Sequence, residues 1–256
     1  METKKKFFFP LLILCLGIVF CISLTSIFFS LSNSQKSSDS AASLSSVSFN
    51  IFFLSLNKCQ NENEAISLGK DVMTNDDAGY VLENNNNFYV ISSAYENEND
   101  STLVKNKLEK ENKITEIIKI SFPSIKIAST YSNKERDVIS NALNSFHNAY
   151  SLLYDSAISL DNKLTNETNT SLNINSIISK FNKTKDNFDT LFAKSDLNFI
   201  SIIKTHLSNA KLALNKLFEK DFVVQTQTYS SFIKYTYCNI LEINFDLINS
   251  LLTSND

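Results

Sequence analysis

Glycine and proline are scarce in this chain, which has three Gly and two Pro among 256 residues. Tight turns with left-handed backbone and the loops that cradle phosphate groups both depend on glycine. The scarcity therefore argues against an all-β fold with many tight turns. It also argues against a phosphate-binding loop of the Gly-rich kind.

Histidine is equally rare, with His147 and His206 as the two copies. Zinc hydrolases need clustered His and carboxylate ligands, and neither histidine lies in an HExxH-like setting. The chain has no GxSxG motif, no Walker loop, and no Cys beside a His that could activate it. These absences predict a non-enzymatic protein without a catalytic residue, a metal site or a cofactor.

A broad basic surface is also missing. Lys and Arg number 24 against 27 Asp and Glu, and Lys4, Lys5 and Lys6 precede the first apolar segment. The remainder of the chain is acidic in balance, so no electrostatic footprint for nucleic acid is expected.

The four cysteines show no CxxC pair. Cys15 and Cys21 fall within the first apolar segment, and Cys59 and Cys238 lie far apart outside it. Two interpretations are open for the second pair: free thiols, or a Cys59–Cys238 disulfide that would need an oxidising compartment.

Residues 7–29 form an uncharged apolar run. At 1.5 Å per residue this run is long enough to cross the roughly 30 Å hydrocarbon core, and it exceeds the usual signal-peptide core of about 7 to 15 residues. The basic residues before it place a cytoplasmic tail at residues 1–6 and everything after it outside the cell. We predict a single-pass anchor in the cell membrane, followed by a flexible Ser-rich linker at residues 30–46.

A repeat follows the linker, because Asn61-Glu62-Asn63 recurs 36 residues later as Asn97-Glu98-Asn99. Apolar positions recur with it, and each copy indicates a strand, an Asx-capped amphipathic helix and a second strand. The predicted elements are a strand at 49–56, a helix at 62–74, strands at 79–83 and 87–95, a helix at 98–111 and a strand at 114–122. The order βαββαβ predicts a small sheet at residues 47–127 with both helices on one face.

This order, the duplication and the anchor together resemble the SPOR domain, a peptidoglycan-binding module of bacterial division and sporulation proteins. The clearest stretch is FYVISSAY at residues 88–95, in which Ser93 and Tyr95 take the places of the family's Gly and second aromatic residue. The resemblance implies a ferredoxin-like fold and a sheet face that binds glycan strands stripped of their stem peptides.

Alternation along the two central strands predicts which side chains would form that face. Phe53, Ser55, Tyr89 and Ile91 are assigned to the open side, opposite Leu54, Leu56, Val90 and Ser92 on the helix side. Exposed aromatic rings could stack on sugars, and nearby polar groups could hydrogen-bond to them. The predicted glycan-binding residues are Phe53, Ser55, Asn57, Tyr89, Ile91 and Tyr95. The alternative is that the C-terminal half or a partner protein covers this face.

From residue 133 onward the apolar period is helical. A heptad seam in the first helix comprises Ile139, Leu143, Phe146, Tyr150, Leu153, Ala157, Leu160 and Leu164. A polar run at residues 165–170 is expected to end that helix, and further helices are predicted at 173–194, 196–219 and 222–252. Short connections favour an antiparallel four-helix bundle at residues 133–256, with the seam either in its core or against a partner helix.

The sequence thus predicts an α+β protein with a transmembrane helix, a SPOR-like domain and an all-α bundle. The first functional hypothesis is a non-enzymatic protein that binds peptidoglycan glycan strands in cell division or sporulation, with the bundle available to a protein partner. The alternative is an extracytoplasmic interaction or structural protein whose SPOR-like domain no longer binds glycan. The accessibility of the sheet face distinguishes the two.

Overall fold

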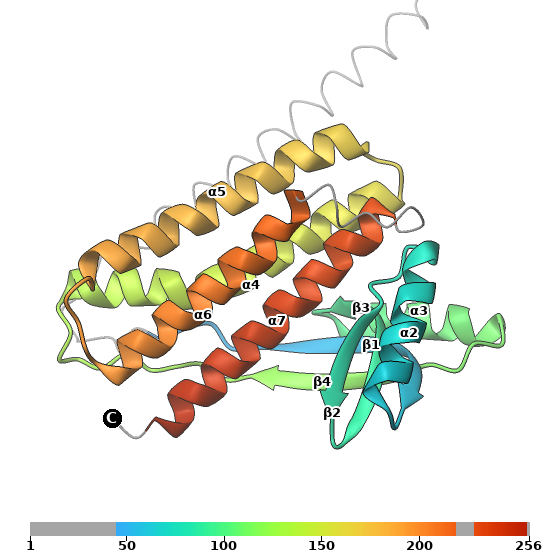
Figure 1. The fold of residues 1–256 in the computed structure, drawn as a ribbon, viewed down its shortest axis with the longest axis horizontal. Helices are drawn as coiled ribbons and strands as arrows, with labels where there is room; N and C mark the ends of the chain where they lie inside the picture. The colour runs from blue at the N-terminus through green and yellow to red at the C-terminus, as the bar shows by residue number, and fades with distance from the viewer. Residues whose placement is uncertain (1–44, 219–227, 255–256) are drawn as a thin grey trace, which may run out of the picture. The chain divides into compact units, whose positions relative to one another are not determined.

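The computed structural model describes residues 45–218 and 228–254 as a mixed α+β structure (Figure 1). The predicted tail, the apolar segment at 7–29 and nearly all of the linker lie outside these residues. No helix within the described ranges combines the length and the apolar character that crossing a membrane requires. Residues 43–256 form one compact unit.

The first half contains four strands and two α-helices in the order βαββαβ. These are β1 (Phe49–Cys59), α2 (Glu62–Val72), β2 (Tyr80–Asn84), β3 (Asn87–Tyr95), α3 (Glu98–Lys110) and β4 (Glu116–Phe122), with a 3₁₀ turn, η1 (Met73–Asn75), after α2. The strands form one antiparallel sheet in the order β2-β3-β1-β4. The predicted order of elements is confirmed.

The repeated asparagines begin the two short helices. The Asn61 side chain accepts hydrogen bonds from the backbone N–H groups of Asn63 and Glu64, and Asn97 accepts one from Asn99. Each Asn therefore satisfies donors that the first helical turn leaves without a partner. Both helices then cover the same face of the sheet, where α2 packs on Val90 and α3 on Leu54.

Four longer helices make up the second half. These are α4 (Asn133–Asp161), α5 (Glu167–Leu191), α6 (Asn198–Asn215) and α7 (Tyr229–Thr253), with a 3₁₀ turn, η2 (Lys216–Phe218), after α6. Helix α4 contacts α5, α6 and α7, while α5 also packs on α6 and α6 on α7.

The heptad seam of α4 lies in the molecule's own core. Its members from Ile139 to Ala157 are buried, and Leu160 packs against the same core. Leu164 lies beyond the end of α4 and is 79 % exposed. The interpretation of the seam as an intramolecular core is therefore confirmed within α4.

Two predicted helix starts are wrong. Helix α7 begins at Tyr229, with Thr228 as its N-cap, rather than near residue 222. Helix α5 begins at Glu167 rather than near residue 173, so the polar run at 165–170 does not form the connection. The Asn166 side chain caps the helix by accepting a hydrogen bond from the Asn169 backbone N–H at 2.9 Å, and Thr170 is already buried in the first turn. A good N-cap starts a helix even where the first turn lacks large apolar residues.

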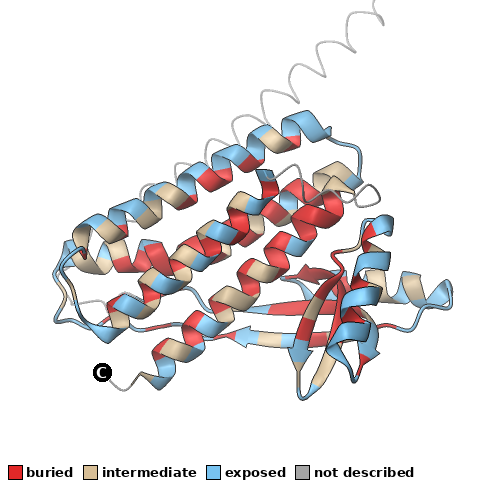
Figure 2. Ribbon diagram, viewed as in Figure 1, coloured by how far each residue is buried: buried red, intermediate tan, exposed pale blue. Residues whose placement is uncertain are grey.

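The sheet and the long helices share one hydrophobic core. Its members come from the sheet face opposite α2 and α3, and from all four long helices. Helix α7 lies against β2 and β3 on one side and against α4 and α6 on the other (Figure 1). In Figure 2 the central strands and much of α7 are accordingly coloured as buried.

Candidate functional site

The predicted open face of the sheet is covered. Phe53, Ser55, Tyr89 and Ile91 do lie on one face, as predicted, but they are 1 %, 2 %, 4 % and 0 % exposed. The expectation of an accessible glycan-binding face is therefore wrong for these four residues. The second half of the chain provides the cover, which is the alternative that alternation along the strands could not exclude.

Asn57 and Tyr95 do not belong to that face. In the pairing of β1 with β3, Leu56 has no partner residue, so the register shifts between Ser55 and Asn57. Asn57 is exposed. On β3, Ser92 likewise has no partner residue. This β-bulge reverses the alternation of faces for the residues that follow it. Tyr95 consequently packs with Phe52 and Leu54 on the side of α3. The structure brings together four of the six predicted site residues.

Tyrosines of α4 and α7 form much of the cover. The Tyr237 hydroxyl lies 2.6 Å from the Ser93 Oγ, and the Tyr150 hydroxyl donates to the Ala94 backbone oxygen at 3.2 Å. The Tyr150 and Tyr237 rings are themselves in edge contact, with centroids 5.6 Å apart. Burial raises the pKa of both phenols above the ordinary value for Tyr.

A buried ammonium group joins α7 to α4 and to the loop before β2. Lys234 is 7 % exposed, and its Nζ donates to the Asp76 backbone oxygen at 2.7 Å and to the Asp161 carboxylate at 2.5 Å. Ser230 donates a second hydrogen bond to Asp161. A buried charge needs such partners, because an unpaired one would cost several kcal/mol. The sequence contains a signal for this contact, since Lys234 directly follows the apolar Ile233 in a mostly apolar helix.

A cleft of about 530 Å³ opens where the covered face ends, between the β2–β3 turn, β4 and α7. Phe53 lines its inner end, and Glu83, Glu242 and Asp246 supply carboxylates. Tyr80 donates a hydrogen bond to Glu242. Burial raises the pKa of Glu242, and the negative charges of Asp246 and Glu83 add to the rise, while the bond from Tyr80 opposes it.

Two cysteines and two histidines lie in the part of the chain that the structure describes. Cys59 and Cys238 are free and buried in separate clusters, on the α2 face of the sheet and in the core shared with α7. Burial raises the pKa of both thiols, which reduces their nucleophilicity. His147 Nε2 lies 3.0 Å from a Glu96 carboxylate oxygen without forming a hydrogen bond, and His206 Nδ1 lies 2.9 Å from the Ile202 backbone oxygen. Within the described ranges, no group of three or more potential ligands could hold a metal ion.

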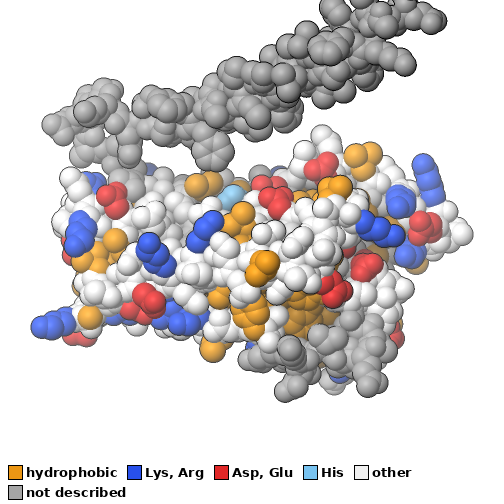
Figure 3. All heavy atoms as spheres, turned by 90° about the horizontal axis from the view of Figure 1, so that it is seen from above, with side chains coloured by type: hydrophobic (Ala, Val, Ile, Leu, Met, Phe, Trp, Pro, Cys, Tyr) orange, Lys and Arg blue, Asp and Glu red, His pale blue; other side chains and the backbone are white. Residues whose placement is uncertain are grey.

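The surface carries charges of both signs. On the face drawn in Figure 3, basic and acidic side chains are interspersed with uncharged polar groups. Comparisons with protein-family models, curated proteins and solved structures each find no match to this chain.

Proposed function

We propose that this protein is a non-enzymatic, membrane-anchored interaction protein whose SPOR-like sheet has become an internal packing surface. Residues 7–29 would hold it in the bacterial membrane with residues 1–6 in the cytoplasm. Its ferredoxin-like domain and antiparallel four-helix bundle would then act together outside the cell, in division or sporulation. The observation that carries the proposal is the burial of Phe53, Tyr89 and Ile91 beneath the long helices.

The energetics favour a face that stays covered. Fully burying a side chain the size of Phe or Ile contributes about 1.5 to 3 kcal/mol. Several such side chains lie on this face, and uncovering it would also break the hydrogen bonds to Tyr150, Tyr237 and Lys234. The sum is comparable to the entire net stability of a typical domain, about 5 to 15 kcal/mol. A glycan strand would have to supply that free energy before it could bind.

Binding of glycan through this face is the competing function, and it rests on the family resemblance alone. A pulldown on purified peptidoglycan sacculi, native and amidase-treated, can decide between the two. The protein would be residues 43–256, the compact unit, compared with a Tyr89→Phe variant. This change removes the hydroxyl that Tyr89 could offer a sugar and keeps its ring.

We expect the variant to be retained to the same extent as the parent, whether that extent is zero or not, because a covered face contributes nothing. Thermal unfolding followed by circular dichroism would establish that both proteins are folded. A folded variant that loses retention, together with a parent that binds denuded glycan better than native sacculi, would restore the glycan-binding function of the sheet.

A further inference from the structure

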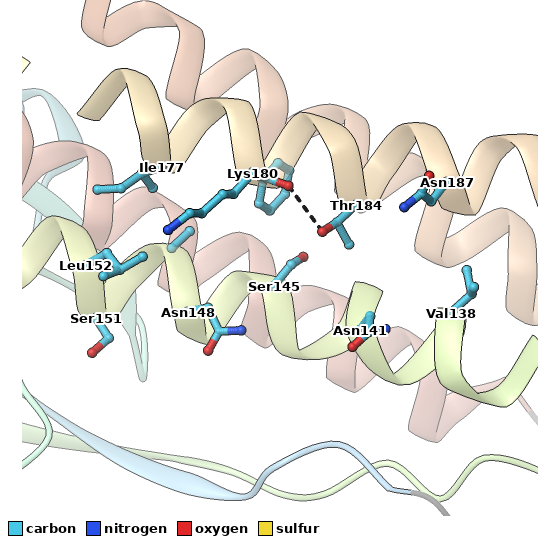
Figure 4. A pocket seen from close by; sticks show the side chains of 12 residues that line it. Val138, Asn141, Ser145, Asn148, Ser151, Leu152, Ile177, Lys180, Thr184 and Asn187 are labelled. Atoms are coloured by element: carbon cyan, nitrogen blue, oxygen red, sulfur yellow. Dashed lines mark hydrogen bonds between the residues drawn. The ribbon is translucent and has the colours of Figure 1, made fainter. Parts of the chain in front are cut away.

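A furrow with polar and apolar lining runs between α4 and α5, on the side of the bundle away from the sheet contacts. It begins as a hollow of about 490 Å³, shown in Figure 4, and continues into a second hollow of about 340 Å³ toward the α4–α5 connection. Leu152, Ile177 and Lys180 line both hollows, which makes them parts of one feature. Small side chains at Ser145 and Ala149 leave the space between the helices open.

The first hollow is lined by amides, hydroxyls and apolar side chains, and by no carboxylate. Asn141 and Asn148 project from α4, and Asn187 faces them from α5 (Figure 4). All three are exposed, and no hydrogen bond to another described residue engages their side-chain amides. Lys180 supplies the one formal charge of this hollow, and Asp155 adds a carboxylate to the second hollow.

The spacing of the asparagines suits an extended chain. Asn141 and Asn148 are seven residues apart on one face of α4, which separates them by about 10.5 Å along the axis at 1.5 Å per residue. Three residues of an extended peptide cover about 10 Å. A side-chain amide carries a donor and an acceptor, as a peptide group does, so each Asn can pair with one peptide group of such a ligand.

A second, independent observation points to an occupant. Thr170 lines the continuation of the furrow and is 0 % exposed, yet its Oγ1 has no hydrogen-bond partner among the described residues. Buried hydroxyls in folded proteins nearly always have a partner, and Thr170 Oγ1 is an exception that lies beside the furrow.

We propose that this furrow binds an extended peptide segment of a partner protein, with near-neutral side chains and an acidic group opposite Lys180. The inference deepens the proposed function, on which it rests, by naming the surface and the chemistry of the partner. A saccharide fits less well, because stacking needs an exposed ring and Phe181, the aromatic residue of the furrow, is 3 % exposed.

The test uses a phage-displayed library of random dodecapeptides, selected on residues 43–256, with the affinity of enriched peptides measured by fluorescence anisotropy. We expect enriched peptides to bind an Asn141→Ala/Asn148→Ala variant at least tenfold more weakly. The matched control is Asn175→Ala/Asn209→Ala, which removes two exposed asparagines of α5 and α6 outside the furrow and should leave the affinity unchanged. Both variants introduce Ala, a residue that favours helices, at exposed positions, so both should fold.

The proposal is wrong if no peptide is enriched, or if enriched peptides bind the furrow variant and the parent equally well. It is also wrong if tetra-N-acetylchitotetraose binds the furrow in place of a peptide. None of these results alters the sheet face, so the sacculus comparison would still decide the proposed function separately.

Discussion

Phe53→Ala is expected to lower the free energy of unfolding by about 3 to 5 kcal/mol, the usual cost of truncating a buried Phe. Phe53 is 1 % exposed, pairs with Ala94 and Ile118 across the sheet, and belongs to the core that the sheet shares with the long helices. Ala would leave a cavity at the meeting point of two layers that can collapse only in part. Urea denaturation of residues 43–256 would measure the change.

The matched control is Leu103→Ala on α3, where the side chain is 67 % exposed. We expect a change within about 0.5 kcal/mol, as for most surface substitutions. If Phe53→Ala were as mild as this control, Phe53 would be accessible to solvent, and the account of a covered sheet face would fail.

Gly79→Ala is expected to cost about 3 kcal/mol or more, because two independent penalties coincide there. The φ angle of Gly79 is 61°, in the left-handed region where a Cβ costs roughly 1 to 2 kcal/mol. A Cβ would also lie 2.2 Å from the Gly69 backbone oxygen, where α2 approaches the start of β2. Overpacking of this kind typically adds 1 to 3 kcal/mol. Thermal unfolding of the variant would report the loss.

Asn85→Ala separates the two penalties. Asn85 has a φ of 50° in the exposed β2–β3 turn, so this variant meets the backbone penalty without a close backbone contact. We expect it to cost about 1 kcal/mol, since Asn already bears part of the strain. Equal costs for the two variants would contradict the close approach of α2 to β2.

The repeat made the first half of the fold predictable from the sequence. Asn61 and Asn97 carry a local signal, because a side chain that caps a helix acts on backbone groups two or three residues away. Alternation also assigned Phe53 and Leu54 to opposite faces of the sheet correctly. Both inferences depend only on interactions within one strand or one helical turn.

The candidate site could not be predicted to the same degree, because its state depends on contacts between distant segments. Alternation separates the two faces of the sheet but does not say what covers each face. It therefore could not predict that Tyr237 contacts Ser93. The bulge at Ser92, which turns Tyr95 to the other face, follows from strand register and leaves no mark in composition. The furrow likewise arises from small residues on α4 that meet polar ones on α5.

Hydroxyl-radical footprinting of residues 43–256 tests the covered sheet face most directly, because modification rates report the solvent accessibility of each ring. Tyr89 and Tyr237 are 4 % and 0 % exposed, whereas Tyr235 on α7 is 37 % exposed and provides an internal reference. We predict that Tyr89 and Tyr237 are protected at least tenfold relative to Tyr235 in the folded protein and equally reactive in urea. Modification of Tyr89 at the rate of Tyr235 in the folded protein would contradict the account.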